Sequence, residues 1–374
     1  MNHPQPRGGA GRENSGPRAG PLAPRLALVY GPRALVALAV VAGCSSATEP
    51  DSPPTSEADP EIHRIISTGD FFPGSNWNDP HVLHDGSQFI MFASAAQSFD
   101  QNVRIYRLVS DDGIQWELEP RDPVLERGEE GEWDAGSVET PAVVWFAGRY
   151  HLFYTGYPSD HLEVTSYRIG HAESPDGIRW TKTGSILAPS DPEGPPNLDF
   201  RQFVVGEPGP VVRGDTLHLY FTAVGANPGV GTILQVIGRM SAVDDGGRLR
   251  WNDPMSVLEP DQTLYPRQRY VGYSTPNAIL RDGEIHLYVD VVEDDPWRQV
   301  ALHRVISPDG MTAWVHDDAP LFRREDFSWT REEIRSPAVL DHDGRRYLFF
   351  AGHTGLDLSI GVAIFPPGEG AGQR

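Results

Sequence analysis

The chain has very few thiols and amines. Cys44 is the only cysteine and Lys182 the only lysine among 374 residues. A single thiol allows no internal disulfide, so packing has to stabilise the fold. The 31 Lys and Arg residues are outnumbered by 52 acidic ones, which gives a net charge of −21. So acidic a chain excludes nucleic acid and anionic lipid surfaces as expected partners.

The sequence also lacks an apolar run long enough to span a bilayer. The run from Ala34 to Ala42 follows Arg25 and Arg33 and leads into Gly43-Cys44. A basic segment, a short apolar stretch and small residues are typical of an export signal. The end of this run resembles a bacterial lipobox, which would make Cys44 the lipidated first residue of the mature protein. An ordinary signal peptide with an incidental cysteine is the alternative.

We therefore expect residues 1–43 to be a signal peptide, whose start codon is either correct or assigned too far upstream. Residues 44–61 are rich in Ser, Pro and acidic residues and are typical of a flexible tether, and 367–374 are expected to be a disordered tail. Residues 62–366 are expected to form one monomeric domain. The protein would be exported and anchored to the cell envelope, with the lipid on Cys44 as its only membrane contact.

A short unit recurs five times between these segments. Each copy has a residue followed by proline, an alternating strand, a turn and an aromatic-rich strand. The prolines are separated by 61, 67, 68 and 61 residues. The five openings are Asp79-Pro80, Thr140-Pro141, Glu207-Pro208, Thr275-Pro276 and Ser336-Pro337.

The second half of each period contains another pair of strands. Asp-Gly turns followed by a tryptophan, as in Asp112-Gly113 before Trp116, are typical of a hairpin closed by a packed side chain. Each period therefore holds about four short antiparallel strands and no helix. The sequence predicts an all-β, five-bladed β-propeller, with a strand from one end of the domain completing the fifth blade.

In a propeller, the innermost strand of each blade lines a central channel. The residue before each aligned proline is then expected at one mouth of that channel. Asp79 and Glu207 are the two carboxylates among the five. Since burying an unpaired carboxylate is costly, their presence there indicates a functional site.

These motifs resemble the five-bladed β-propeller glycoside hydrolases, the superfamily that contains families 43, 32, 68 and 130. Trp77-Asn78-Asp79-Pro80 is similar to the first-blade motif of family 32, and Gly206-Glu207-Pro208 to the third-blade motif. The resemblance implies that Asp79 is a nucleophile, as in family 32, or a general base, as in family 43. It implies that Glu207 is the general acid. The expected substrates are oligo- or polysaccharides of arabinose, xylose or fructose type.

The second blade departs from the family pattern. These families place another Asp there, whereas this chain has Thr140, with Glu139 before it and Asp134 six residues earlier. Either acid could substitute, although strict alternation would point Glu139 away from the side of Thr140.

Several further residues are candidates for binding the sugar. Aromatic faces stack on sugar C–H surfaces, although packing between blades is the alternative for each ring. Arginines could contact hydroxyl groups or counter the acids. The candidates beside the acids are Trp77, Asn78, Trp133, Asp134, Thr140, Arg201, Tyr273, Thr275, Trp329, Arg335 and Ser336.

No cofactor is required by this chemistry. The resemblance to family 43 leaves room for a calcium ion in the central channel, and it makes His353 a candidate neighbour of that ion. A protein that binds carbohydrate without cleaving it is a second hypothesis, because the second-blade Asp is missing. Phosphorolysis, as in family 130, would need a basic phosphate pocket, and no Arg-Lys-His cluster stands at the blade entrances.

Overall fold

The computed structural model describes residues 59–96, 102–158, 167–195, 197–227, 232–294 and 296–367. The predicted signal peptide 1–43, Cys44, most of the 44–61 tether and nearly all of the 367–374 tail lie outside these ranges. Their assignments therefore stay predictions. Within the described ranges, no helix has the length and apolarity needed to cross a membrane.

The described chain is built almost entirely from strands, so the all-β prediction is confirmed. One short 3-10 helix, η2 (Arg324–Asp326), is present. The strands are β1 (Glu61–Ile66), β2 (Asn76–His84), β3 (Phe89–Ala96), β4 (Arg104–Ser110), β5 (Glu117–Leu118), β6 (Ser137–Phe146), β7 (Arg149–Tyr157), β8 (Arg168–Ser174), β9 (Thr181–Leu187), β10 (Val204–Arg213), β11 (Thr216–Asn227), β12 (Thr232–Asp244), β13 (Leu249–Trp251), β14 (Met255–Leu258), β15 (Tyr270–Arg281), β16 (Glu284–Glu293), β17 (Arg298–Ser307), β18 (Val315–His316), β19 (Phe322–Arg323), β20 (Glu333–His342), β21 (Arg345–Thr354) and β22 (Asp357–Phe365).

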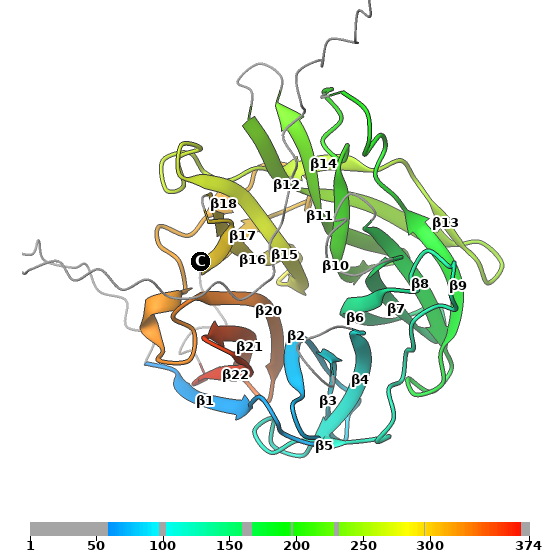
Figure 1. The fold of residues 1–374 in the computed structure, drawn as a ribbon, viewed down its shortest axis with the longest axis vertical. Helices are drawn as coiled ribbons and strands as arrows, with labels where there is room; N and C mark the ends of the chain where they lie inside the picture. The colour runs from blue at the N-terminus through cyan, green and yellow to red at the C-terminus, as the bar shows by residue number, and fades with distance from the viewer. Residues whose placement is uncertain are drawn as a thin grey trace, which may run out of the picture.

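The strands form antiparallel meanders around the centre of the molecule. Three sheets have four strands each, in the orders β2-β3-β4-β5, β6-β7-β8-β9 and β1-β22-β21-β20. A ten-stranded sheet joins β10–β14 to β15–β19 through one parallel pair, Gln235 with Gly272. Strands β2, β6, β10, β15 and β20 surround the centre, and the later strands of each meander lie progressively further out (Figure 1).

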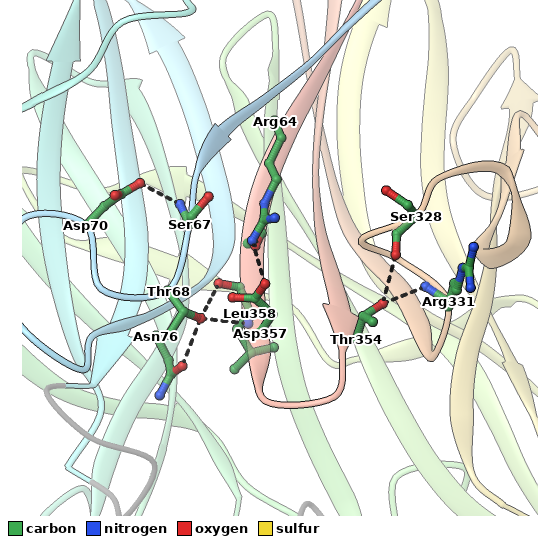
Figure 2. A network of polar contacts seen from close by, with 11 residues as sticks. Arg64, Ser67, Thr68, Asp70, Asn76, Ser328, Arg331, Thr354, Asp357 and Leu358 are labelled. Atoms are coloured by element: carbon green, nitrogen blue, oxygen red, sulfur yellow. Dashed lines mark hydrogen bonds and ion pairs between the residues drawn. The ribbon is translucent and has the colours of Figure 1, made fainter.

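The two ends of the described chain meet in one sheet. β1 pairs antiparallel with β22, so an N-terminal strand completes the C-terminal meander as predicted. Figure 2 shows the polar contacts at this seam. Arg64 donates to Asp357 at 2.9 Å, and the Thr68 hydroxyl donates to the Leu358 carbonyl at 3.1 Å.

The Asp-Gly turns are fixed by their own side chains. Asp112 Oδ1 accepts from the backbone N–H groups of Ile114 and Gln115, each at 2.8 Å. The Ser110 hydroxyl accepts from Gly113 N at 2.9 Å. Trp116 then folds back into the core against Phe349. These turns close the outer hairpins, as the sequence predicts.

Candidate active site

The five residues that precede the aligned prolines share one backbone conformation. Their φ angles are 50° at Asp79, 49° at Thr140, 53° at Glu207, 46° at Thr275 and 55° at Ser336. This left-handed region is uncommon for residues other than glycine. Each residue lies where the register of its strand shifts against the next strand, which is a β-bulge. The repeat therefore has a common local geometry, and the bulge turns these residues out of the regular alternation.

Side chains of neighbouring meanders hold the bulges in place. Four of the five backbone N–H groups donate to a side chain on the second strand of the preceding meander. The pairs are Thr140 N to Ser94 Oγ at 2.9 Å, Glu207 N to Thr155 Oγ1 at 2.7 Å, Thr275 N to Thr222 Oγ1 at 2.9 Å and Ser336 N to Asp290 Oδ1 at 2.9 Å. The equivalent residue for Asp79 is Ala351, whose side chain has no acceptor to offer. Asp79 is thus the exception in an otherwise repeated set of contacts.

The bulges surround a narrow cavity on the axis of the molecule. It measures about 20 Å³ and is lined mainly by the aligned residues and their prolines. A cavity of this size holds about one water molecule. A sugar would therefore have to bind at the mouth rather than inside the channel.

The carboxyl group of Asp79 is buried, with 7% of the residue exposed. Its Oδ1 accepts a hydrogen bond of 2.7 Å from the Ser336 hydroxyl. The backbone N–H of Ser336 donates to Asp290. Ser336 therefore orients Asp79 and connects it to a second buried carboxyl group.

Glu207 is partly exposed and lies beside Asp79. Burial raises the pKa of Glu207, and the nearby charge of Asp79 raises it further. Hydrogen bonds from Thr222 and from the backbone of Thr275, together with the charge of Arg335, work in the opposite direction. The Thr275 N–H donates to Glu207 Oε2 at 3.1 Å. A carboxyl group with a raised pKa suits the role of general acid.

Glu139 belongs to the same group of carboxyls, so the expectation from strict alternation is wrong. Burial, followed by the charges of Asp79 and Glu207, raises the pKa of Glu139 to about 8. The Tyr157 hydroxyl donates to its Oε2 at 3.4 Å. The bulge between Glu139 and Ala142 interrupts the alternation and explains the difference.

Arg335 supplies the positive charge of the site. Its side chain is buried, its Nε donates to Asn78 Oδ1 at 3.2 Å, and it forms an ion pair of 3.1 Å with Glu333. Its charge lowers the pKa of Glu139 and Glu207 against the effect of burial. Of the predicted residues, the structure thus brings Asn78, Thr275, Arg335 and Ser336 to the acids. It places Thr140 beside them, with its hydroxyl 2.5 Å from that of Thr155.

Asp290 is a site residue that sequence reasoning missed. Its side chain is fully buried, and burial, together with the charge of Glu207, raises its pKa well above the usual range. It lies on β16 rather than at a strand entrance. The signal was available, since Asp290 stands alone in the apolar run Leu287–Val292.

The aromatic candidates lie in the core. Trp77 and Tyr273 have 0% exposed surface, so the prediction that they stack on sugar is wrong. Trp133 stacks on Tyr154 at 5.7 Å, and Trp329 stacks on Phe350 at 5.2 Å. Both tryptophans also cover a pair of glycines in their own sheet, where a Cβ atom would collide with the indole ring. Packing, the alternative considered for these rings, is what the structure shows.

Three other candidates lie away from the acids. Asp134 is buried and paired with Lys182 at 2.7 Å and with the Tyr154 hydroxyl at 2.9 Å, so it does not replace the missing Asp. Arg201 pairs with Asp199. His353 reaches the Gly355 carbonyl at 3.0 Å and lies 3.6 Å from Glu333, which places it behind Arg335 rather than on the axis. A larger hollow of about 520 Å³ beside β1 has a single carboxylate, Asp70, in its lining.

Comparison with solved structures defines the fold. A protein described as a glycoside hydrolase matches with a TM-score of 0.63 and 14% identity, over 85% of this chain and 95% of that protein. A thermostable family-43 glycoside hydrolase matches with a TM-score of 0.59 and 14% identity, over 80% and 94%. An α-L-arabinofuranosidase from Lactobacillus brevis matches with a TM-score of 0.58 and 13% identity, over 79% and 92%. The chain therefore has the fold of the β-propeller glycoside hydrolases, and the predicted resemblance is confirmed at that level.

Sequence comparison reaches less of the chain. No family model matches it. The fructan 6-exohydrolase of Beta vulgaris is 45% identical over 47 residues, which is 13% of this chain and 8% of that protein.

Proposed function

We propose that this protein is a glycoside hydrolase on a five-bladed propeller, with Asp79 and Glu207 as its catalytic pair. The observation that carries the proposal is the grouping of Asp79, Glu139 and Glu207 around Arg335. The equivalent positions in the remaining units hold Thr275 and Ser336, which are uncharged. A symmetric scaffold has no packing need for acids at these positions only. The five bulged openings, with strands β2, β6, β10, β15 and β20 innermost, support the count of five blades.

The contacts suggest a role for each group. Asp79 stays ionised and acts as base or nucleophile, held in orientation by the Ser336 hydroxyl. Glu207 donates its proton to the leaving oxygen, for which a raised pKa is required. Glu139, protonated at neutral pH with its pKa of about 8, adds no second negative charge beside Glu207. It thereby takes the place of the second-blade Asp, which the family pattern has and this chain lacks.

The proposed substrate is an arabinose-, xylose- or fructose-type glycan, bound at the mouth of the axis. Support comes from the arabinofuranosidase and fructan exohydrolase among the matched proteins. Asn78, Glu139 and Glu207 are partly exposed and would line the floor of that site. We further propose that the enzyme is an exported lipoprotein that meets this glycan outside the cell. The basis is the apolar run that ends at Cys44.

Replacing Glu207 by Gln tests the catalytic assignment. The variant should lose about 10²–10⁴-fold in turnover on the responsive substrate, because the leaving group is no longer protonated. Turnover is measured on a panel of aryl glycosides, arabinan, xylan and fructan, and folding is followed by circular dichroism. Glu284→Gln makes the same chemical change at an exposed position on β16 and serves as the control. Equal turnover in Glu207→Gln and wild type would remove Glu207 from the mechanism.

A carbohydrate-binding protein without catalysis is the second candidate. It is favoured by the burial of Asp79 and by the narrow axial cavity, because a nucleophile has to reach the anomeric carbon. Binding to the same panel, with no product released by wild type, would support this candidate. Product that forms only with added phosphate would instead indicate phosphorolysis.

A further inference from the structure

One position of the repeat differs in the second meander. On the third strand, the residue paired with a central aromatic is arginine in three meanders: Arg107 opposite Phe92, Arg239 opposite Tyr220 and Arg304 opposite Tyr288. In the second meander it is His171, opposite Phe153. A fixed cation is thus replaced by an imidazole.

The third meander shows what that arginine does. His218, on β11, occupies the position that His151 occupies on β7. Arg239 donates to His218 Nδ1 at 2.7 Å, so a cationic donor meets the lone pair of the imidazole. In the second meander, His151 Nδ1 instead faces His171 Nε2 at 3.0 Å.

Hydrogen bonds at the far side of each ring determine where its proton lies. His151 Nε2 is 3.2 Å from the Phe146 carbonyl, which can only accept, so this nitrogen carries the proton. Thr183 donates its hydroxyl proton to the His171 carbonyl, and therefore accepts from His171 Nδ1 at 2.7 Å. The two facing nitrogens then both present lone pairs. These rings are 2% and 4% exposed, so water cannot relieve the repulsion.

A carboxylate completes the set. Glu173 lies directly opposite His151 in the β7–β8 ladder, and its Oε1 is 3.8 Å from His151 Nδ1. Its other oxygen pairs with Arg149 at 3.0 Å. The three donor atoms lie within 4.8 Å of one another. Two imidazoles and a carboxylate, with outer hydrogen bonds that orient both rings, form the donor set that Zn²⁺ prefers.

We propose that His151, His171 and Glu173 bind a zinc ion that takes the place of the missing arginine. Tetrahedral Zn²⁺ with bonds of about 2.0–2.1 Å needs its nitrogen ligands roughly 3.3 Å apart. The rings, now 3.0 Å apart with planes 11° from parallel, must separate slightly and tilt. The ion clamps β7 to β8. Along β7 it lies four residues, or roughly 13 Å, from Thr155 beside the candidate active site, so its role is structural.

The test uses the purified full chain after dialysis against a chelator. Calorimetric titration with ZnCl₂ should show one site, and Co²⁺ should give visible absorption bands of tetrahedral coordination. Zn²⁺ should also raise the midpoint of thermal unfolding, because it binds the folded state. Glu173→Gln should abolish the Co²⁺ bands. Thr183→Val keeps all three ligands but removes the partner of His171, and should weaken binding about 10–100-fold.

His286→Gln is the matched control, since His286 has the same repeat position on β16 and lies outside the cluster. It should bind Zn²⁺ like wild type. No zinc binding by wild type would overturn the proposal and leave a histidine pair that shares a proton. Equal affinity in wild type, Glu173→Gln and Thr183→Val would overturn it as well, because zinc would then bind elsewhere. The two conservative variants keep the test decisive if replacements of the histidines do not fold.

Discussion

At the scale of single residues, the balance of charge dominates the site. Asp79, Glu139, Glu207 and Asp290 gather near Arg335, and burial raises the pKa of Glu139, Glu207 and Asp290. One guanidinium cannot offset so many ionised carboxylates in a place with little water. Protons therefore remain on some of these groups at neutral pH, which is the state that a general acid needs.

The burial of Glu139 makes the stability of the protein depend on pH. Its pKa is about 8 in the folded protein and about 4.3 when unfolded, so between these values the unfolded state loses a proton that the folded state keeps. Stability therefore falls as pH rises through this window. Glu139→Gln should match wild type at pH 4 and exceed its unfolding free energy by about 1–3 kcal/mol at pH 7.5. Urea unfolding at both pH values measures the difference, and a gap that is the same at both would contradict the assignment.

Sequence reasoning located residues whose position the repeat determines. Asp79, Glu207, Thr275 and Ser336 align on their prolines, and the structure brings them together. It could not locate residues whose surroundings depend on tertiary packing. A tryptophan before an inner strand has the same local sequence whether it faces sugar or covers two glycines, as Trp133 does.

At the scale of elements, the recurring device is a bulged strand held by the neighbouring meander. The prolines predict where each strand begins, and the Asp-Gly pairs predict the turns. The bulge itself was not predictable, because it depends on an acceptor such as Thr155 or Asp290 more than 45 residues away in the chain. This is why alternation misplaced Glu139.

Removing one of these acceptors should destabilise the fold. Thr155→Val leaves the Glu207 N–H without its 2.7 Å acceptor and Thr140 without its hydroxyl partner. A buried unsatisfied donor costs about 1–3 kcal/mol of unfolding free energy. Urea unfolding compares this variant with Thr181→Val, an exposed change on β9 expected to stay within about 0.5 kcal/mol of wild type. Similar effects of both substitutions would show that the bulge is held in another way.

At the scale of the whole molecule, the seam between β1 and β22 joins the two ends of the described chain. Ile66 is fully buried there with Ile360 and Val362, and Arg64 reaches Asp357 across the same pair of strands. The neighbours that share the fold at 13–14% identity show that its architecture depends on such patterns more than on particular side chains.

Loss of this seam should affect the whole domain. A chain that begins at Ser67 lacks β1, so the edge of β22 is open and the apolar side chains that covered Ile66 meet water. Burial of one such isoleucine contributes about 1.5–3 kcal/mol, and the lost pairing adds to it. We expect the unfolding free energy to fall by about 3 kcal/mol or more relative to a chain that begins at Asp59. Urea unfolding of both chains measures this, with Arg64→Ala in the longer chain as the milder perturbation. Coincident unfolding curves for the two chains would mean that β1 only decorates the last sheet, and that β20–β22 hold the end of the domain without it.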